Sequence, residues 1–402
     1  MSCNIWSDCE KIPITELLSF IVDNRGKTVP TAPRGHKLIA TNCVTNNTLF
    51  PVYEKIRYLS EETYQTWFRA HPIPGDILFV NKGTPGRVCL VPDPVDFCIA
   101  QDMIALRADR TKIYPKYLFA VLRSREIQQQ IYNTNVGDVI PHFKKQFMNQ
   151  ILIPLPDRAM QETIGDLYYV LSLKMEHNKK VNDNLERQVQ AYFQELFVDN
   201  ADPAWTLGTI SNLGTVVGGS TPSKSKPEYY TEDGIAWITP KDLSINKAKF
   251  ISHGENDITE LGLKNSSTSI MPEGTVLFSS RAPIGYIAIA SGEVTTNQGF
   301  KSVVPKPEIG TAYVYCFLKH NLPVIEGRAS GSTFKEVSGS TMKNVPAVIP
   351  DTETLTCFND FCVPIFAHQR ILEEQNQSLA ALRDSLLPKL MSGEIDVSGI
   401  DL

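Results

Sequence analysis

The first 157 residues alternate short apolar runs with turn-forming residues, which predicts a module of strands and loops. Residues 77–80 and 88–91 are apolar and flank a segment rich in glycine and proline, so we expect two strands joined by a loop. Residues 115–132 place apolar side chains on one side of a helix, and residues 151–156 predict a closing strand. The two prolines of that strand separate the module from the helix that follows.

Two long stretches have the periodicity of helices. From about residue 160 to 197, and again from about residue 364 to 390, apolar and polar side chains recur in steps of three and four. Such seams suffice for a pair of helices but not for an independent coiled coil. We predict that the two helices pair antiparallel; the alternative is that each helix packs only on its own module. The seam positions include Leu171, Asn178, Val181 and Leu185 in the first helix and Leu372, Leu379, Leu382 and Leu386 in the second.

The whole pattern occurs twice. Residues 74–79 return as residues 272–278, and at an offset of 199 Lys82 meets Arg281. The offset falls to 197 where Gln101 meets Gln298, and to 194 at the end of the module, as insertions in loops would produce. A period near 195 is far longer than the roughly 20–50 residues of a solenoid repeat. The sequence therefore predicts a duplicated domain, each copy followed by a long helix.

These patterns together predict an α+β fold. Two duplicated α/β domains would be joined by two long antiparallel coiled-coil helices, with an approximate twofold relation between the halves. The predicted divisions are 1–157 for the first domain, 158–200 for a central helix, 201–356 for the second domain, and 357–402 for a C-terminal helix and tail. Within the second domain we expect the same succession of strands, with one helix over residues 312–322.

The charge of the chain is close to balanced. Its net charge is −5, although residues 1–157 carry 18 basic and 15 acidic side chains. Because local patches decide binding to nucleic acid, this balance neither supports nor excludes DNA as a ligand. It does predict that the chain alone binds phosphates weakly.

The cysteines and the N-terminus bear on the compartment. Eight cysteines stand at 3, 9, 43, 89, 98, 316, 357 and 362, with neither zinc spacing nor a disulfide framework. The first residues lack the basic and apolar regions of a signal peptide, and no stretch approaches the roughly 20 apolar residues of a membrane helix. We expect a cytoplasmic protein with reduced thiols and no membrane contact.

Motifs of catalysis or of metal binding are not evident. Gly26-Lys27-Thr28 resembles the end of a phosphate-binding loop, but that motif requires glycine at position 21, where Ile21 stands. The seven histidines show no metal-ligand spacing and no visible pairing with a nucleophile. We predict a protein without catalytic residues, without a metal site and without a cofactor of its own.

Basic and polar residues recur on loops at equivalent places in the two domains. Residues 81–87 match residues 280–286, and residues 140–145 match residues 334–337. Lysine and arginine beside serine, threonine and asparagine are the groups that contact phosphates and base edges. The alternative is that these are ordinary solvated loops. The candidate DNA-binding residues are Lys82, Thr84, Arg87, His142, Lys144 and Lys145 in the first domain, and Lys224, Lys226, Thr239, Lys241, Ser280, Arg281 and Lys335 in the second.

Several segments stand in a fixed order in the duplicated halves: Arg25-Gly26-Lys27-Thr28-Val29-Pro30, Gly75-Asp76-Ile77-Leu78-Phe79, Gly219-Ser220-Thr221-Pro222, Ile235-Ala236-Trp237-Ile238, Thr296-Asn297-Gln298-Gly299 and the ending 382–395. In this order they resemble the specificity subunits of type I restriction-modification systems. The likeness covers nearly the whole chain.

The resemblance implies a non-catalytic subunit that recognises double-stranded DNA. Each domain would be a target-recognition domain for one half of a bipartite, asymmetric sequence. The helices would recruit two modification (methyltransferase) subunits through the seam residues, and restriction (endonuclease and translocase) subunits would join the complex. S-adenosylmethionine, ATP and magnesium would belong to those partners. Leu38 stands where the second domain has Trp237, so the two domains should read different half-sites.

Two other functions remain to be weighed. One is a bilobed adaptor whose repeated loops bind protein without reading DNA. The other is an enzyme with two half-sites, which the missing catalytic motifs disfavour.

Overall fold

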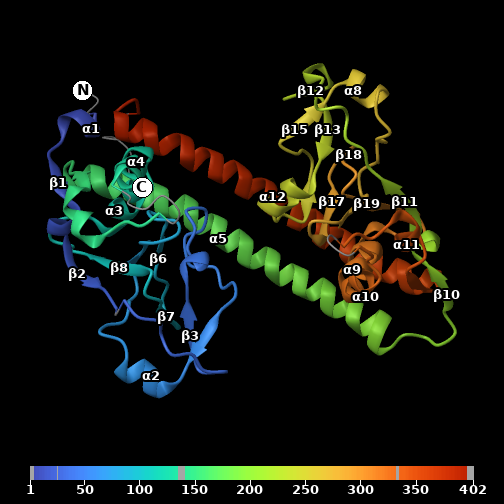
Figure 1. The fold of residues 1–402 in the computed structure, drawn as a ribbon, viewed down its shortest axis with the longest axis horizontal. Coiled ribbons are helices and arrows are strands. Elements are labelled where there is room, and N and C mark those ends of the chain that lie inside the picture. The colour runs from blue at the N-terminus through green and yellow to red at the C-terminus, as the bar shows by residue number, and fades with distance from the viewer. Residues whose placement is uncertain (1–3, 25, 135–140, 332–334, 396–402) are drawn as a thin grey trace. The chain divides into compact units, whose positions relative to one another are not determined.

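The computed structural model describes residues 4–24, 26–134, 141–331 and 335–395. The chain forms two compact units, the first made of Met1–Asn178 with Gln375–Leu402 and the second of Lys179–Glu374 (Figure 1). Each unit thus contains one domain and a part of both long helices. Of the residues discussed above, Cys3, Arg25, Ile140 and Phe334 lie outside the described ranges.

The first unit contains sheets of two, four and three strands, in the orders β1-β9, β2-β8-β5-β6 and β4-β3-β7. Neighbouring strands are antiparallel except β3 and β7, which are parallel. The strands are β1 (Lys11–Pro13), β2 (Leu18–Val22), β3 (His36–Ile39), β4 (Arg57–Leu59), β5 (Ile77–Val80), β6 (Val88–Leu90), β7 (Phe97–Ile99), β8 (Met103–Ala108) and β9 (Leu152–Pro154). The helices of the domain are α1 (Ile5–Asp8), α2 (Glu61–Thr66), α3 (Pro115–Leu122) and α4 (Arg125–Asn133), with 3-10 turns at Ile14–Leu17, Thr41–Cys43 and Lys145–Gln150.

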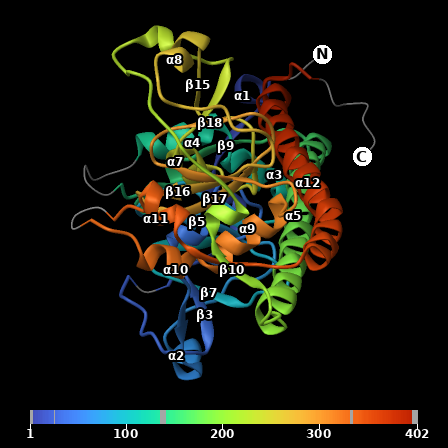
Figure 2. The ribbon, with the colours of Figure 1, turned by 90° about the vertical axis from the view of Figure 1, so that its right-hand side faces the viewer.

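The second unit repeats this plan with sheets β10-β20, β11-β19-β16-β17-β14 and β12-β15-β13-β18. Its strands are β10 (Thr206–Thr209), β11 (Gly214–Gly218), β12 (Tyr230–Thr231), β13 (Ile235–Ile238), β14 (Phe250–Ile251), β15 (Asn256–Ile258), β16 (Val276–Ser280), β17 (Ile284–Ala290), β18 (Thr295–Thr296), β19 (Lys301–Pro305) and β20 (Pro346–Ile349). Its helices are α6 (Ile210–Leu213), α7 (Pro240–Ile245), α8 (Glu260–Lys264), α9 (Thr311–His320), α10 (Leu322–Gly327) and α11 (Gly339–Lys343), with a 3-10 turn at Pro227–Tyr229. Within this unit, α8 and the sheet β12-β15-β13-β18 lie at the opposite end from α9 and α10 (Figures 1 and 2).

The duplication extends to the pairing of strands. Leu38 lies opposite Cys98 in the parallel pair β3–β7, and Trp237 lies opposite Thr295 in the parallel pair β13–β18. An isolated bridge joins Lys82 to His142, and another joins Arg281 to Glu336 at the equivalent place. The predicted duplicated α+β fold is therefore confirmed.

Both faces of the four-stranded sheet β2-β8-β5-β6 of the first unit are buried, which explains the continuous apolar runs of its strands. Along β5, Ile77 and Phe79 belong to the core that α3 and α4 cover, whereas Leu78 and Val80 belong to a second core on the opposite face. This alternation is the period of two expected of a strand. The strands predicted at 77–80 and 88–91 are confirmed as β5 and β6, to within one residue.

The helix predicted over residues 115–132 is two helices. Ser124 ends α3, because its hydroxyl donates to the carbonyl oxygen of Val121 at 2.7 Å, and it caps α4 by accepting from the amide of Ile127 at 3.4 Å. The helix predicted at 312–322 is likewise divided into α9 and α10, with Pro323 in the first turn of α10. At the first junction, capping by Ser124 thus overrides an apolar periodicity that continues across it.

The long helices are α5 (Arg158–Gln194), which continues into a π-helical turn at Glu195–Asp199, and α12 (Thr352–Ser392). The start predicted for α12 near Pro364 is wrong. The carboxylate of Asp351 accepts the amide of Thr354 at 2.8 Å and so caps the helix twelve residues earlier, and Pro364 lies inside it. Asp157 caps α5 in the same way, through the amide of Met160 at 2.9 Å.

The two long helices are antiparallel, as predicted. Asn178 on α5 donates to Asn376 on α12 at 3.0 Å, within the first unit. Within the second unit, Asn182 donates to Glu373 at 3.2 Å and Gln369 donates to Glu186 at 3.5 Å, so numbering rises along α5 as it falls along α12. Val181 and Leu382 are 43% and 46% exposed, so the prediction that they lie in the apolar seam is corrected: they face solvent.

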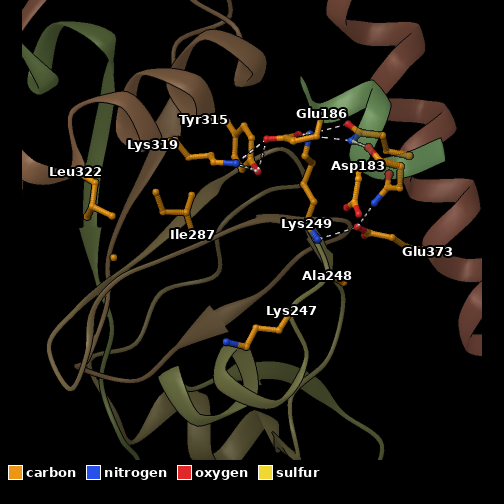
Figure 3. A pocket seen from close by; sticks show the side chains of 13 residues that line it. Asp183, Glu186, Lys247, Ala248, Lys249, Ile287, Tyr315, Lys319, Leu322 and Glu373 are labelled. Atoms are coloured by element: carbon orange, nitrogen blue, oxygen red, sulfur yellow. Dashed lines mark hydrogen bonds and ion pairs between the residues drawn. The ribbon is translucent and has the colours of Figure 1, made fainter. Parts of the chain in front are cut away.

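A buried charge cluster holds α5 to the second domain (Figure 3). The carboxylate of Glu186 pairs with Lys249 and, at 2.6 Å, with Lys319. The Lys249 side chain is only 5% exposed; it also donates to Gln369 at 2.6 Å and lies over the ring of Phe366. Two flanking ammonium groups outweigh the cost of burial and lower the pKa of Glu186 to about 2.

Close packing of α5 on the first domain yields a test of the fold. A Cβ at Gly165 would lie 2.6 Å from the amide nitrogen of Tyr117 and 2.9 Å from the carbonyl carbon of Lys116. Although alanine favours a helix over glycine by about 1 kcal/mol, we expect Gly165→Ala to destabilise the first unit, by a net loss of about 1–2 kcal/mol. Gly327→Ala in α10 is the control, since nothing lies within 4 Å of that Cβ and the change should be neutral or stabilising. Denaturant unfolding of both variants measures the difference, and a stabilising Gly165→Ala would contradict this packing.

Candidate nucleic-acid interface

A polar pocket of about 540 Å³ opens on the first domain. Four segments form it: the residues after β2, the residues after β5, the turn before β8 and the segment beginning at His142. Its walls are Asp23, Asn24, Gly26, Asn81, Lys82, Gln101, Asp102, His142, Lys144, Lys145 and Gln146. We call it the first-domain pocket.

Backbone hydrogen bonds fix these segments to one another. The carbonyl oxygen of Asn81 accepts the amide of Phe143 at 2.8 Å, and the amide of Asn81 donates to the carbonyl oxygen of Asp102 at 2.9 Å. Lys145 forms an ion pair with Asp23, and burial lowers the pKa of Lys145. Lys82 and Lys144 also line the pocket, and both residues are exposed. The pocket therefore has a rigid backbone frame with cations at its rim.

The second domain has a pocket of about 710 Å³ at the corresponding place. We call it the second-domain pocket; its walls are Thr221, Lys224, Tyr230, Trp237, Thr239, Pro240, Lys241, Glu255, Asn256, Arg281, Ala282, Asn297, Gln298 and Gly299. Gln101 and Gln298 occupy matching positions in the two pockets, as do Lys82 and Arg281. An aromatic pair, Tyr230 and Trp237, lines only the second of them, with ring centroids 5.7 Å apart.

Many polar groups of the second-domain pocket are paired with each other. Lys241 pairs with Glu255 at 2.5 Å, and that hydrogen bond raises the pKa of Lys241. Arg281 lies 3.4 Å from Glu336. Thr239 and Asp242 form a capping box at the start of α7, in which the hydroxyl of Thr239 donates to the carboxylate of Asp242 at 2.6 Å. Lys241 and Arg281 are thus held in place by carboxylates, as positioned contacts to a ligand would be.

Close packing in the second domain explains the glycine at position 219 of the Gly218-Gly219 segment. A Cβ at Gly219 would lie 2.2 Å from the carbonyl oxygens of both Thr296 and Asn297. The glycine therefore allows a close approach that sets the hydroxyl of Thr221 to donate to the carboxamide oxygen of Gln298.

The structure brings together eight of the thirteen candidate DNA-binding residues. Lys82, His142, Lys144 and Lys145 meet in the first-domain pocket, and Lys224, Thr239, Lys241 and Arg281 in the second. Thr84, Arg87, Lys226 and Lys335 are not among the walls of either pocket.

Ser280 requires a correction. It is fully buried, and its hydroxyl donates to the carbonyl oxygen of Gly299 at 3.1 Å, because the strand β16 turns this side chain inward. Ser280 is therefore a structural residue and not a surface contact to DNA.

The sequence reasoning missed the carboxamide side chains of both pockets. They are Asn24, Asn81, Gln101 and Gln146 in the first domain, and Asn256, Asn297 and Gln298 in the second. One signal was available, because Gln101 and Gln298 match at an offset of 197. The others stand far apart in the chain and in different local contexts.

Comparison with known proteins fits this arrangement of two equivalent pockets. Residues 21–187 and 204–372 each match the family model of the type I restriction modification DNA specificity domain. The chain belongs to this family. The role predicted from the sequence, recognition of a DNA sequence within a type I restriction-modification system, is thereby confirmed, and nothing supports the adaptor alternative. The family also confirms the prediction of a specificity subunit rather than a catalytic one.

Two relatives are specificity subunits of type I restriction enzymes. The MjaIX subunit of Methanocaldococcus jannaschii is 43% identical over 40% of this chain and 38% of its own length. The HindI subunit of Haemophilus influenzae is 23% identical over 80% of this chain and 86% of its own. The crystal structure of an S subunit from M. genitalium has the same fold, with a TM-score of 0.59 and 17% identity over 96% of each chain. Both relatives are thus named as subunits of type I restriction enzymes.

Two further findings concern what the described residues contain. None of the helices in those ranges is long and apolar enough to cross a membrane. The described histidines, cysteines and acidic residues form no group of three that could hold a metal ion.

Proposed function

We propose that the two domains read different halves of a bipartite, asymmetric DNA target, one half through each pocket. The observation that carries this proposal is the pair of pockets at equivalent places with different walls. Cations stand at matching positions, Lys82 and Arg281, where they suit phosphates. The side chains around them differ, with Asn81 in one domain and the Tyr230–Trp237 pair in the other, and differing side chains suit different base sequences.

We assign the catalytic reactions of the complex to the partner subunits and not to this chain. We propose that α5 and α12 recruit two modification subunits, with Leu171, Asn178, Val181, Leu185, Leu372, Leu379, Leu382 and Leu386 as the candidate contacts. The exposed Val181 and Leu382 suit this role better than a role in the seam, because apolar side chains at 43% and 46% exposure are available to a partner. Restriction subunits would complete the complex. S-adenosylmethionine, ATP and magnesium would bind to these partners.

The proposed compartment is the cytoplasm, where such a complex meets DNA. Free thiols at Cys43, Cys89, Cys98, Cys316 and Cys362 are all buried, and they support a reducing environment.

The test is DNA binding by the chain with and without its modification subunits. The net charge of −5 opposes binding to DNA, and Lys241 and Arg281 are already paired to carboxylates, whereas phosphate neutralisation is the main source of affinity. We expect the chain alone to bind weakly, and the complex to bind one bipartite sequence about a thousandfold or more tighter than unrelated DNA at fixed salt. Mapping of methylated sites by sequencing identifies the target. Tight, specific binding by the isolated chain would contradict the role assigned to the partners, and a complex without a bipartite target would contradict the whole proposal.

A further inference from the structure

In the first unit, a further pocket of about 790 Å³ opens at one end of the sheet β2-β8-β5-β6. Its walls come from the start of β2, the turn before β5, the residues after β6 and β8, the start of α3, and α5. The first-domain pocket lies at the other end of the same strands, after β2 and β5 and before β8. We therefore call the new pocket the first distal pocket.

The second unit has a pocket of about 390 Å³ at the equivalent place, which we call the second distal pocket. The backbone shows the equivalence. The amide of Gly75 donates to the carbonyl oxygen of Val91 at 3.0 Å, and the amide of Gly274 donates to that of Ala290 at 2.9 Å. Both glycines have a left-handed backbone, with φ of 84° and 83°. The first pair of residues lines the first distal pocket, and the second pair lines the second.

Apolar side chains stand at equivalent positions in the walls of both distal pockets. Phe50 and Leu90 line the first, and Phe250 and Ile289 line the second. The amides of Leu90 and Ile289 donate to the residues just before the two phenylalanines, at 2.8 and 2.7 Å, so the same backbone bond places both pairs.

The long helices complete the two pockets. Tyr169 of α5 lines the first distal pocket, and Val363 of α12 lines the second. These two residues are 194 positions apart, as are Asp157 and Asp351, which cap the two helices. Each distal pocket thus lies between a domain and the first part of the long helix that follows it.

Both distal pockets expose apolar surface to solvent. Ile73, in the wall of the first, is 46% exposed, and Val363, in the wall of the second, is 63% exposed. The phenylalanines and Tyr169 are half-buried. An apolar side chain of a partner that covers these residues would remove their surface from water, which is the main favourable contribution to protein association.

Charged groups in the same walls are paired within the protein. Asp76 accepts two hydrogen bonds from the guanidinium of Arg107, both at 2.9 Å, in the first distal pocket. Arg370 pairs with Glu273 at 2.6 Å in the second. Because these charges already have partners, they favour an apolar ligand over a phosphate group.

The number of distal pockets selects the partner. A chain with two equivalent pockets can bind two copies of one partner in the same way, one copy to each half. Two modification subunits for each chain are the stoichiometry of the proposed function, and the helices proposed to recruit them form one wall of each pocket. A second copy of this chain fits less well, because head-to-tail contacts between chains with two such sites extend into filaments unless they close into a ring.

We propose that each distal pocket receives an apolar side chain of one modification subunit, so that the two pockets anchor one subunit each. The first-domain and second-domain pockets, at the other ends of the strands, stay free for the half-sites. This inference rests on the proposed function, since it locates the contacts of the modification subunits that this function requires.

The test counts the modification subunits that the full chain binds, by native mass spectrometry during titration with purified modification subunit. Ile73→Arg and Val363→Arg each place a long charged side chain in the wall of one distal pocket. We expect each variant to bind one modification subunit as the wild type does, and the other about 30-fold or more weakly, as the loss of a central interface contact does. The double variant should bind both subunits weakly.

Two matched controls place the same charge on apolar surface elsewhere. Tyr132→Arg in the first unit and Leu207→Arg in the second change side chains that are 72% and 83% exposed and are not among the walls of either distal pocket. Both controls should bind two modification subunits with wild-type affinity. In the single pocket variants, the subunit bound by the other half reports that the chain is folded.

Two modification subunits bound with wild-type affinity by Ile73→Arg or Val363→Arg would overturn the inference. If either variant binds no subunit at all, Ile73→Ala or Val363→Ala takes its place, with an expected loss of about 5-fold for one subunit, and an unchanged affinity there also overturns it. Self-association of the chain alone that Val363→Arg abolishes would assign the pocket to a second copy and overturn it too. A wild-type chain that binds no modification subunit would instead refute the proposed function.

Discussion

Replacing Glu186 by glutamine should destabilise the second unit by about 3 kcal/mol. The change removes the charge that neutralises Lys249, whose side chain is 5% exposed and lies among Tyr315 and Phe366. Breaking a buried ion pair from one side leaves an uncompensated charge, and this costs about 3–5 kcal/mol. The lower end applies because Gln369 still accepts from Lys249. The measurement is hydrogen exchange of the β16 and β17 amides in denaturant, which reports the second unit by itself.

Two matched variants show whether the charge is the cause. Glu162→Gln removes an exposed carboxylate that pairs with Arg158 on the same helix, and it should cost at most about 0.5 kcal/mol. Glu186→Gln combined with Lys249→Met removes both charges of the buried pair and should recover part of the loss. A Glu186→Gln variant as stable as the Glu162→Gln variant would contradict the role given to the cluster.

The same substitution has a defined pH dependence. The pKa of Glu186 is lowered in the folded protein to about 2, so its ionised form contributes stability above its ordinary pKa of 4.5. That contribution disappears as the pH falls from about 4.5 towards 2. The stability difference between the wild type and Glu186→Gln should therefore be full at neutral pH and shrink across this acid range.

Lengthening both long helices should abolish methylation of the natural target and create a target with a longer spacer. The compact units divide α5 between Asn178 and Lys179, and they divide α12 between Glu374 and Gln375. Four residues inserted at each of these two points add about 6 Å and about 400° of helical rotation, which is close to a full turn. With B-DNA rising about 3.4 Å per base pair, the spacer between unchanged half-sites should grow by one or two base pairs.

The placement of the insertions keeps the contacts between the helices. The hydrogen bond of Asn178 to Asn376 stays within the first unit, and that of Asn182 to Glu373 stays within the second. Insertion into α5 alone is the control, because it shifts one helix against the other and should reduce assembly. Sequencing of methylated sites decides the outcome. An unchanged spacer with full activity would show that the helices hold partners without setting the distance.

The amino-acid sequence by itself determined the duplication and the class of the fold. Matches such as Gln101 with Gln298 and Lys82 with Arg281 follow from the chain alone, and so do the apolar runs that became β5 and β6. These features are local or periodic, which is why pattern reasoning reaches them. The start of α12 is also indicated by the sequence, because Asp351 follows a proline as Asp157 does, although Pro364 favours a later start.

Only the tertiary structure decided which side chains line the first-domain and second-domain pockets. Asn24 and Asn81 are 57 residues apart, and they meet because β2 and β5 are both neighbours of β8 in one sheet. The sequence predicts Ser280 as a polar loop contact, but in the structure Ser280 belongs to β16 and its hydroxyl points inward to Gly299. Which face of a strand is buried, and which polar atoms lack partners there, depends on what packs against that face from distant parts of the chain. Local sequence does not contain this information, because those contacts form only when the sheet is assembled.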